Sequence, residues 1–438
     1  MQQPKGIELA AANAQTPDTG AHPGTRSQQQ ARKLVLRLLG AIGRGSLTLE
    51  EGGNTWRFGE AEENATLHAH IRVHRPDMYA DVLLRGSIGA GEAFMHGAWS
   101  SPDLTQVIRL MVANMGMLDD MDGRRFTPRK LLTAASRTLL RAFHALRSNT
   151  RRGARRNIAA HYDLGNDFYA LFLDPTMMYS AAIFPSDDST LHEASLYKLD
   201  RICRKLQLQP GDHLLEIGTG WGGLALHAAR HYGCRVTTTT ISREQYDYAQ
   251  KAVAAAGLGD RIELLLSDYR DLEGRYDKLV SVEMIEAVGH NYYRAYFEQC
   301  ARLLHPQGLM LLQAITIADQ RFDAARREVD FIQRYIFPGG SLPSTTVIAN
   351  HLTRHTDLKI VGLEDITQHY ARTLHAWRER FLARADAVRA QGFDEVFIRL
   401  WQFYLCYCEG GFRERSIGAQ QFLLAKPRCL LEPPLGTL

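Results

Sequence analysis

The sequence predicts an α/β protein with a doubly wound, mostly parallel sheet and a smaller α+β domain on its N-terminal side. The first observation is a strand–turn–helix unit, in which the apolar residues 214–217 run into a glycine turn at 218–220 and residues 224–230 follow with helical spacing. The second is a series of strand-like runs that end at polar residues, at 235–241, 261–266 and 276–282. Ligands bind at the carboxyl ends of the strands in such sheets, so these turns are the candidate site.

The glycine turn indicates close contact between the backbone and a nucleoside cofactor. Gly218 and Gly220 can adopt positive φ angles and let a ligand approach the main chain. With Gly223 they satisfy a bare G-x-G-x-x-G pattern, but the dinucleotide fingerprint also requires an acidic residue about 20 positions later, at the end of the second strand. That strand ends instead at Thr240-Ile241-Ser242, which disfavours a dinucleotide.

The turn and four further motifs carry a resemblance to a known family. Residues 216–222 (EIGTGWG) resemble motif I of class I S-adenosylmethionine methyltransferases. The other motifs are HYDLGNDFY at 161–169, MYSAAIF at 178–184, VEMIEAVGH at 282–290 and YIFPGGSLPS at 335–344. Together the five motifs resemble the cyclopropane-fatty-acid synthase family, including its mycolic acid relatives, over about residues 155–425.

The resemblance implies an S-adenosylmethionine-dependent methyltransferase with a class I fold. The cofactor would be held by the glycine turn, by residues after the second and third strands, and by upstream tyrosine motifs. The residues assigned to this site are Tyr162, Tyr179, Ser180, Glu216, Gly218, Gly220, Thr240, Ile241, Gln245, Asp268 and Tyr269. Thr240 and Gln245 have a second interpretation, because such residues also serve the start of a helix.

The resemblance also implies the chemistry, which is methyl transfer to the cis double bond of an acyl chain. This step leaves a carbocation, and in the family a bound bicarbonate, held by a cysteine, a glutamate, a histidine and a tyrosine, is thought to remove a proton. Glu286 and Tyr370 match the glutamate and the tyrosine. Ala181 and Gln313 stand in place of the cysteine and the histidine, so the predicted base site departs from the family pattern.

The identity of the proton acceptor stays open at this stage. Either bicarbonate binds through backbone N–H groups, Gln313 and Tyr370, or Glu286 itself takes the proton. Glu283 stands where many relatives have glycine, and it fits the catalytic site and the scaffold equally well. The product depends on this base: cyclopropanation is favoured, and a methylene- or methyl-branched acyl chain is the alternative.

The chain of 438 residues has the composition of a globular protein, 45% hydrophobic and 23% charged, which excludes a disordered or fibrous class. The resemblance implies that the N-terminal α+β domain binds lipid. The expected order is a flexible lead (1–30), the α+β domain (31–119), a basic linker (120–156), a methyltransferase domain with an acyl-binding helical insertion (157–430) and a tail (431–438).

The linker region concentrates positive charge. Between residues 123 and 162 there are eleven Lys and Arg residues and no Asp or Glu, although the formal net charge of the chain is only +4. Leu132, Leu139 and Phe143 recur at helical spacing among them, which predicts a basic amphipathic helix. Such a helix either lies on an anionic bilayer or is an ordinary surface helix with solvated arginines.

Membrane contact is favoured because the substrate of the family is an acyl chain in a phospholipid. The expected partner is therefore an unsaturated phospholipid in an anionic membrane surface, and the expected location is the cytoplasm, in peripheral association with the inner face of the cell membrane. Nucleic acid is not expected as a partner, because no recognised nucleic-acid module accompanies the basic region. A homodimer is left open.

The six cysteines are scattered without C-x-x-C spacing, so neither a metal site nor a disulfide framework is predicted. No stretch approaches the length and apolarity of a membrane span. Two other classes of function stay open. A methyltransferase for a soluble acceptor would not need the basic helix, and a lipid-binding module without catalysis would fit if Ala181 and Gln313 mark an inactive site.

Overall fold

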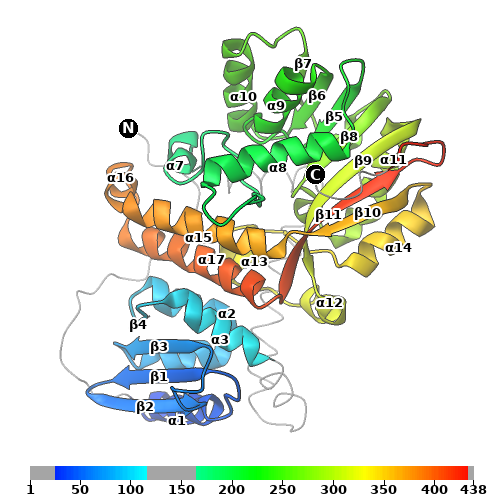
Figure 1. The fold of residues 1–438 in the computed structure, drawn as a ribbon. Helices are drawn as coiled ribbons and strands as arrows, with labels where there is room; N and C mark the ends of the chain where they lie inside the picture. The colour runs from blue at the N-terminus through cyan, green and yellow to red at the C-terminus, as the bar shows by residue number, and fades with distance from the viewer. Residues whose placement is uncertain (1–24, 116–163, 433–438) are drawn as a thin grey trace.

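The computed structural model describes residues 25–115 and 164–432 (Figure 1). The first 24 residues of the predicted lead, the last residues of the tail and the basic linker lie outside the described residues, as does Tyr162. Within the described ranges, no helix combines the length and the apolar character needed to cross a bilayer.

The N-terminal unit is a four-stranded sheet covered by helices, as the predicted α+β class requires. Leu47 and Leu49 on the central strand have no exposed surface, and their alternation with polar neighbours turns one face of the sheet toward the helices. The strands, in the order β2-β1-β3-β4, are β1 (Ser46–Glu51), β2 (Asn54–Gly59), β3 (His68–Val73) and β4 (Trp99–Ser100). The helices are α1 (Arg26–Leu39), α2 (Asp77–Met95) and α3 (Leu104–Ala113).

One local expectation for this unit was wrong. The first helix begins at Arg26, inside the predicted flexible lead of residues 1–30, because Thr25 and Gln28 form a capping box and Ala31 packs in the core. The helix α2 consists of two helical segments on either side of Gly86, whose φ of 54° is not helical, and it ends at Met95. Trp99 belongs to strand β4.

The larger sheet has seven strands and confirms the doubly wound, mostly parallel α/β class. In the order β10-β11-β9-β8-β5-β6-β7, the strands from β9 to β7 are parallel, and β11 runs antiparallel to both β9 and β10. The strand order reverses at β5, which is where open sheets form their ligand-binding crevice. The bounds are β5 (His213–Ile217), β6 (Arg235–Thr240), β7 (Ile262–Leu266), β8 (Tyr276–Val282), β9 (Leu304–Ile317), β10 (Lys359–Asp365) and β11 (Ile417–Ala425).

Helices cover both faces of this sheet (Figure 1). Leu214 packs in the cluster formed with α8, α9 and α10, whereas its neighbour Leu215 packs in the cluster formed with α11 and α14. Consecutive strand residues point to opposite faces, so both faces of β5 are apolar and buried. The helices are α8 (Leu191–Lys205), α9 (Gly223–Tyr232), α10 (Arg243–Ala255), α11 (Tyr293–Leu303) and α14 (Thr345–His355).

A helical layer separates the large sheet from the N-terminal unit (Figure 1). Its aromatic rings pack against one another; Phe168 and Trp401, for example, meet edge to face with ring centroids 4.9 Å apart. Residues 367–383 and 385–390 form two separate helices, because Arg384 between them has a non-helical φ of −115°. The helices are α15 (Thr367–Ala383), α16 (Ala385–Ala390) and α17 (Glu395–Arg413), with the short α7 (Asn166–Ala170), α12 (Asp319–Ala325) and α13 (Phe331–Tyr335) nearby.

The N-terminal unit docks on this layer through α2 and α3, which pack on α17. The backbones approach closely at two glycines. A Cβ atom on Gly410 would lie 2.6 Å from the Ile108 side chain, and one on Gly91 would overlap the Phe331 ring. Glycine at these positions therefore sets the distance between the two units.

Replacement of Gly91 by leucine is expected to lower the free energy of unfolding by about 1–3 kcal/mol, because the added side chain overfills a packed contact with Phe331. Urea unfolding followed by circular dichroism measures the change. Leucine at Gly259, where a Cβ meets no atom within 4 Å, is the matched control. Equal stability of the two variants would contradict close packing at Gly91.

Candidate active site

The glycine turn joins β5 to α9 at the point where the strand order reverses. Gly218 has φ 103° and Gly220 has φ 53°, angles that side chains rarely adopt. The N–H groups of Gly218 and Thr219 both donate to the carbonyl oxygen of Thr239 on β6, at 3.1 and 3.0 Å. These two hydrogen bonds tie the turn to the neighbouring strand.

Three of the predicted cofactor residues are buried and hydrogen-bonded inside the protein. Glu216 accepts from the Thr238 hydroxyl at 2.6 Å, and burial raises the pKa of this carboxyl to about 8. The Thr240 hydroxyl donates to the Gln245 side-chain oxygen at 2.9 Å, between the end of β6 and the first turn of α10. This contact matches the helix-start interpretation of the pair and leaves the Gln245 amide N–H groups for other contacts.

The other predicted residues at this edge follow β6 and β7. Ile241 is half-buried just after β6. Asp268 caps the short helix η1 (Tyr269–Asp271) and accepts from the Arg270 guanidinium at 2.6 and 2.8 Å. The hydroxyl of Tyr269 is shielded from solvent and has no hydrogen-bond partner among the described residues. These side chains lie beside the glycine turn, because parallel strands end at the same edge of the sheet.

The upstream motif at 178–184 packs against this edge. The hydroxyl groups of Tyr179 and Tyr404 lie 2.9 Å apart. Ser180 accepts a hydrogen bond of 2.7 Å from Lys198, an ammonium with no exposed surface. Burial lowers the pKa of Lys198 to about 8, and the charges of Glu283, Asp174 and Glu216 oppose this shift.

Glu283 is the point on which the predicted catalytic residues converge. Its Oε1 accepts from the Ala181 backbone N–H at 2.9 Å and from the Gln313 side-chain amide at 2.7 Å. Its Oε2 accepts from the Tyr370 hydroxyl at 2.6 Å. These are the groups that the sequence assigned to bicarbonate, and in the structure they bind a carboxylate of the chain itself.

The backbone at Glu283 is strained in a way that explains the family pattern. Its φ of 49° lies in the left-handed region, which costs a side chain about 1–2 kcal/mol and glycine almost nothing. The resemblance places glycine at this position in many relatives. Strained residues cluster at functional sites, so a glutamate retained here is a candidate functional residue.

Glu286 lies close to Glu283 but has a different environment. Its Oε1 accepts from the backbone N–H of Ile315, whereas its Oε2 is shielded from solvent and has no partner among the described residues. Burial and the neighbouring charge of Glu283 raise the pKa of Glu286 to about 8. This carboxyl therefore holds its proton at neutral pH.

The pKa of Glu286 predicts a pH-dependent stability. Between pH 4.5, its ordinary pKa, and about 8, only the unfolded chain releases the proton, so the free energy of unfolding falls by at most about 1.4 kcal/mol per pH unit as pH rises. Glu286→Gln cannot ionise, and it is expected to gain stability over the parent at pH 8 but not at pH 4.5. Urea unfolding at both pH values measures this gain, with Glu298→Gln, whose side chain is 42% exposed, as control. A gain that is the same at both pH values would contradict the assignment.

The sequence missed several residues of this site. The Ala181 N–H carries no side-chain signal, and Gln421 was not singled out, although it donates to Gln313 at 2.8 Å. Lys198 and Lys205 were detectable, because both fall on the buried stripe of α8 with Leu191, Ala194 and Ile202. A lysine at an inward position of an amphipathic helix indicates a buried ammonium that needs partners.

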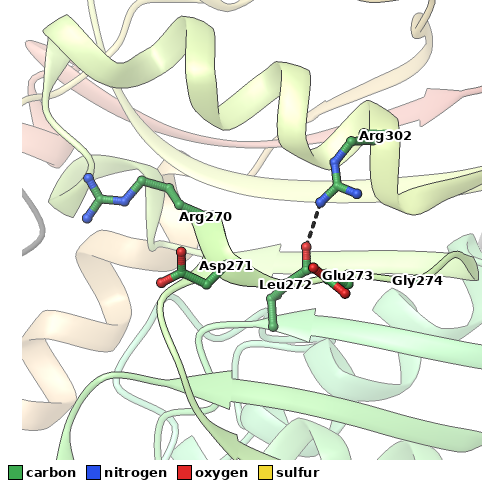
Figure 2. A pocket seen from close by; sticks show the side chains of 6 residues that line it. All are labelled: Arg270, Asp271, Leu272, Glu273, Gly274 and Arg302. Atoms are coloured by element: carbon green, nitrogen blue, oxygen red, sulfur yellow. Dashed lines mark hydrogen bonds between the residues drawn. The ribbon is translucent and has the colours of Figure 1, made fainter.

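A surface cavity lies beside the short helix η1. It has a volume of about 640 Å³ and is lined by Arg270, Asp271, Leu272, Glu273, Gly274 and Arg302. Figure 2 shows that Arg302 donates to the carbonyl oxygen of Leu272 at this cavity. None of the predicted catalytic residues lines it.

Comparison with known proteins identifies the family. A family model described as mycolic acid cyclopropane synthetase matches residues 149–422, more than half of the chain. The chain belongs to this family.

Two relatives are similar to this protein over most of its length. It is 44% identical to the tuberculostearic acid methyltransferase of Mycobacterium tuberculosis, over 81% of this chain and 82% of the relative. It is 38% identical to the cyclopropane-fatty-acyl-phospholipid synthase of Escherichia coli, over 83% of this chain and 89% of the relative.

A solved structure of the family matches the fold. The mycolic acid cyclopropane synthase CmaA1, crystallised with SAH and CTAB, superposes with a TM-score of 0.58 at 34% identity, over 62% of this chain and 98% of that one. The protein is therefore an S-adenosylmethionine-dependent methyltransferase that transfers a methyl or methylene group to a lipid. The glycine turn at 218–220 and the edge beside it are suited to hold the cofactor, because backbone, amide and hydroxyl groups meet there.

Proposed function

We propose that this enzyme methylates the cis double bond of an unsaturated acyl chain in a membrane phospholipid and forms a methylene-branched chain, with Glu283 as the proton acceptor. The convergence of the Ala181 N–H, Gln313 and Tyr370 on the Glu283 carboxylate carries the proposal. In the family, by resemblance, the corresponding groups hold a bicarbonate that acts as the base. Here the chain supplies the anion.

The hydrogen bonds favour Glu283 over Glu286 as the base. Burial raises the pKa of Glu283, while its three donors and the charge of Lys198 stabilise the ionised form. Glu286 has a single backbone donor and keeps its proton at neutral pH. Only an ionised carboxylate can accept a proton, so we assign the role to Glu283, the carboxylate with three donors. The sequence had suggested Glu286 as one of two proton acceptors.

The proposed reaction needs no further reagent. The alkene electron pair takes the methyl group from the sulfonium, which leaves S-adenosylhomocysteine and a cation on the adjacent carbon. A hydride then moves from the methylated carbon to the cationic carbon. Glu283 removes a proton from the new methyl group, and the released electron pair forms the double bond of the methylene branch.

The restricted base favours this product over a cyclopropane. A carboxylate has about four lone-pair positions, and three of those on Glu283 are occupied by donors. Slow proton removal gives the hydride time to migrate before the ring can close. The 44% identical relative is named a tuberculostearic acid methyltransferase and not a cyclopropane synthase, which supports this choice. Cyclopropanation is the second candidate, since the matching family model and the Escherichia coli relative carry that name.

The proposal places the substrate in an anionic membrane surface on the cytoplasmic side. Its support is the basic region at 123–162, whose eleven Lys and Arg residues have no acidic neighbours within it. Vesicles with and without anionic lipid test this part. Equal binding of the enzyme to both would contradict it.

Deuterium labelling tests the reaction. The enzyme is incubated with S-adenosylmethionine and phosphatidylglycerol vesicles whose oleoyl chains carry deuterium on both alkene carbons, and the product is analysed by mass spectrometry and NMR. The proposed route puts both deuterium atoms on the chain carbon next to the one that carries the methylene branch. A cyclopropane keeps one deuterium on each carbon, and this result would overturn the proposed product.

Two further measurements separate the other classes of function. Undiminished methylation of a soluble acceptor without vesicles would indicate a small-molecule methyltransferase. Absence of S-adenosylmethionine binding in calorimetry would indicate a lipid-binding module without catalysis. Either result would overturn the proposal.

A further inference from the structure

We propose that Lys205 and Gln421 are positioning residues, which orient the Gln313 amide toward Glu283 through a one-way chain of hydrogen-bond donors. The inference rests on the proposed role of Glu283 as the base. It extends that role to two residues that do not contact Glu283 directly.

Three neighbouring strands of the sheet align polar residues in one row. Glu364 on β10 is paired in register with Gln421 on β11, and Gln421 is paired with Gln313 on β9. Gln313 in turn lies opposite Val282 on β8, the residue before Glu283. Residues directly opposite one another in neighbouring strands have adjacent side chains on the same face. The row therefore runs from the edge of the sheet to the base.

The hydrogen bonds along this row all point toward Glu283. Lys205 on α8 donates to Gln421 Oε1 at 2.6 Å, Gln421 Nε2 donates to Gln313 Oε1 at 2.8 Å, and Gln313 Nε2 donates to Glu283 Oε1 at 2.7 Å. An ammonium can only donate, so Gln421 must turn its oxygen to Lys205 and its NH₂ group to Gln313. Because Gln421 donates to the oxygen of Gln313, the NH₂ group of Gln313 points to Glu283.

Burial makes this orientation strict. Lys205, Gln421 and Gln313 are 7%, 1% and 0% exposed. Water cannot replace a lost partner there, and a reversed Gln313 amide would face its oxygen to the Glu283 carboxylate. Lys205 is itself held by Glu364, which also accepts from Arg201, so the start of the chain is anchored at the partly exposed edge of the sheet.

The other charged and titratable groups around Glu283 are not part of this row of hydrogen-bond donors. Tyr370 donates from α15, Lys198 acts from α8, and Glu286 lies on the short helix η2 (Ile285–Ala287). Near Lys205 the charged groups are Glu364 and Arg201. Variants of Gln421 or Lys205 leave all three neighbours of Glu283 in place, so a change in the behaviour of Glu283 reports on the Gln313 amide.

The isosteric variant Gln421→Glu is the central test. Its carboxylate still accepts from Lys205 but can no longer donate, so Gln313 must turn its NH₂ group away from Glu283. We expect kcat to fall about 10- to 100-fold, the range for loss of a hydrogen bond to a charged group, with the KM for S-adenosylmethionine unchanged. The acidic limb of the kcat profile is expected to move to higher pH, because Glu283 loses a donor that stabilises its ionised form.

Two lysine variants complete the experiment, which uses the full chain and oleoyl phosphatidylglycerol vesicles. Lys205→Met is expected to resemble Gln421→Glu, and Lys205→Arg, which keeps a donor, is expected to restore most of kcat. Lys426→Met is the matched control, because Lys426 also ends a buried stem in an ion pair, with Asp357 at 2.6 Å, but lies outside the row. Thermal melting of each variant identifies any loss of folding. If a lysine variant does not fold, the result for the isosteric Gln421→Glu variant tests the inference.

A Gln421→Glu enzyme with the kcat and pH profile of the parent would overturn the inference. So would equal losses in Lys205→Met and Lys205→Arg. The product formed by the parent enzyme tests the proposed function separately, because the comparison of variants with the parent is valid whichever product forms.

Discussion

Glu283→Gln is expected to lower the rate of methylated lipid formation by about 100- to 10,000-fold, the usual contribution of a general base. The amide keeps the size of the side chain but cannot accept the proton, and its NH₂ group would meet donors such as Tyr370 or Gln313. Initial rates with labelled cofactor measure the loss, and calorimetry is expected to show unchanged S-adenosylmethionine binding. Glu298→Gln on α11, where the side chain is partly exposed, is the control.

Glu283→Gly distinguishes a base from a structural carboxylate. Glycine relieves the strained φ of 49° and leaves the Ala181 N–H, Gln313 and Tyr370 without their anion. We expect this variant to be inactive in buffer free of carbon dioxide and to recover activity when bicarbonate is added, because these donors can then bind the added anion. Full activity of Glu283→Gln, together with no response of Glu283→Gly to bicarbonate, would remove Glu283 from the mechanism.

Gly218→Val is expected to weaken S-adenosylmethionine binding by about 10- to 100-fold or more. A φ of 103° is unfavourable for any side chain, at a cost of about 1–3 kcal/mol, and the new Cβ would lie 3.4 Å from Met284, beside the turn that the cofactor must approach. Isothermal titration calorimetry measures the dissociation constant. Methyl transfer is expected to fall in parallel at low cofactor concentration.

Gly211→Val provides the comparison for this variant. Gly211 precedes β5, and a Cβ there meets nothing within 4 Å. Unchanged affinity in the Gly211 variant and weaker affinity in the Gly218 variant would assign the effect to the turn. Cofactor affinity that survives in Gly218→Val would place the cofactor elsewhere.

Much of the fold could be predicted because its signals are local. The runs that became β6, β7 and β8 were visible from β-branched and apolar residues that end at polar positions, and the helix start that Thr240 and Gln245 suggested is present, with Ser242 as the cap of α10. An error lies at the N-terminus, where composition predicted a flexible lead but Thr25 and Gln28 cap a helix that begins at Arg26.

The candidate site was only partly predictable. Its members could be listed from motifs, but Glu283 and Glu286 could not be ranked, and Gln421 and Lys205 were not singled out. The hydrogen bonds of Glu283 join it to Ala181, 102 residues away, and to Tyr370, 87 residues away. No periodicity or cap rule links positions that are so distant along the chain.

The sequence by itself determined the class of protein. A glycine turn after an apolar strand lets a nucleoside cofactor approach the backbone, and five ordered motifs indicate the family. It also showed that Ala181 and Gln313 depart from the family pattern. Only the tertiary structure decided what replaces the missing groups. Strand register brings Gln421 and Gln313 into one row. Glu283, with its strained φ just after β8, accepts a hydrogen bond from the Gln313 amide at the end of this row. The charge and partners of a buried carboxylate depend on such contacts in space, because burial makes every lost hydrogen bond costly.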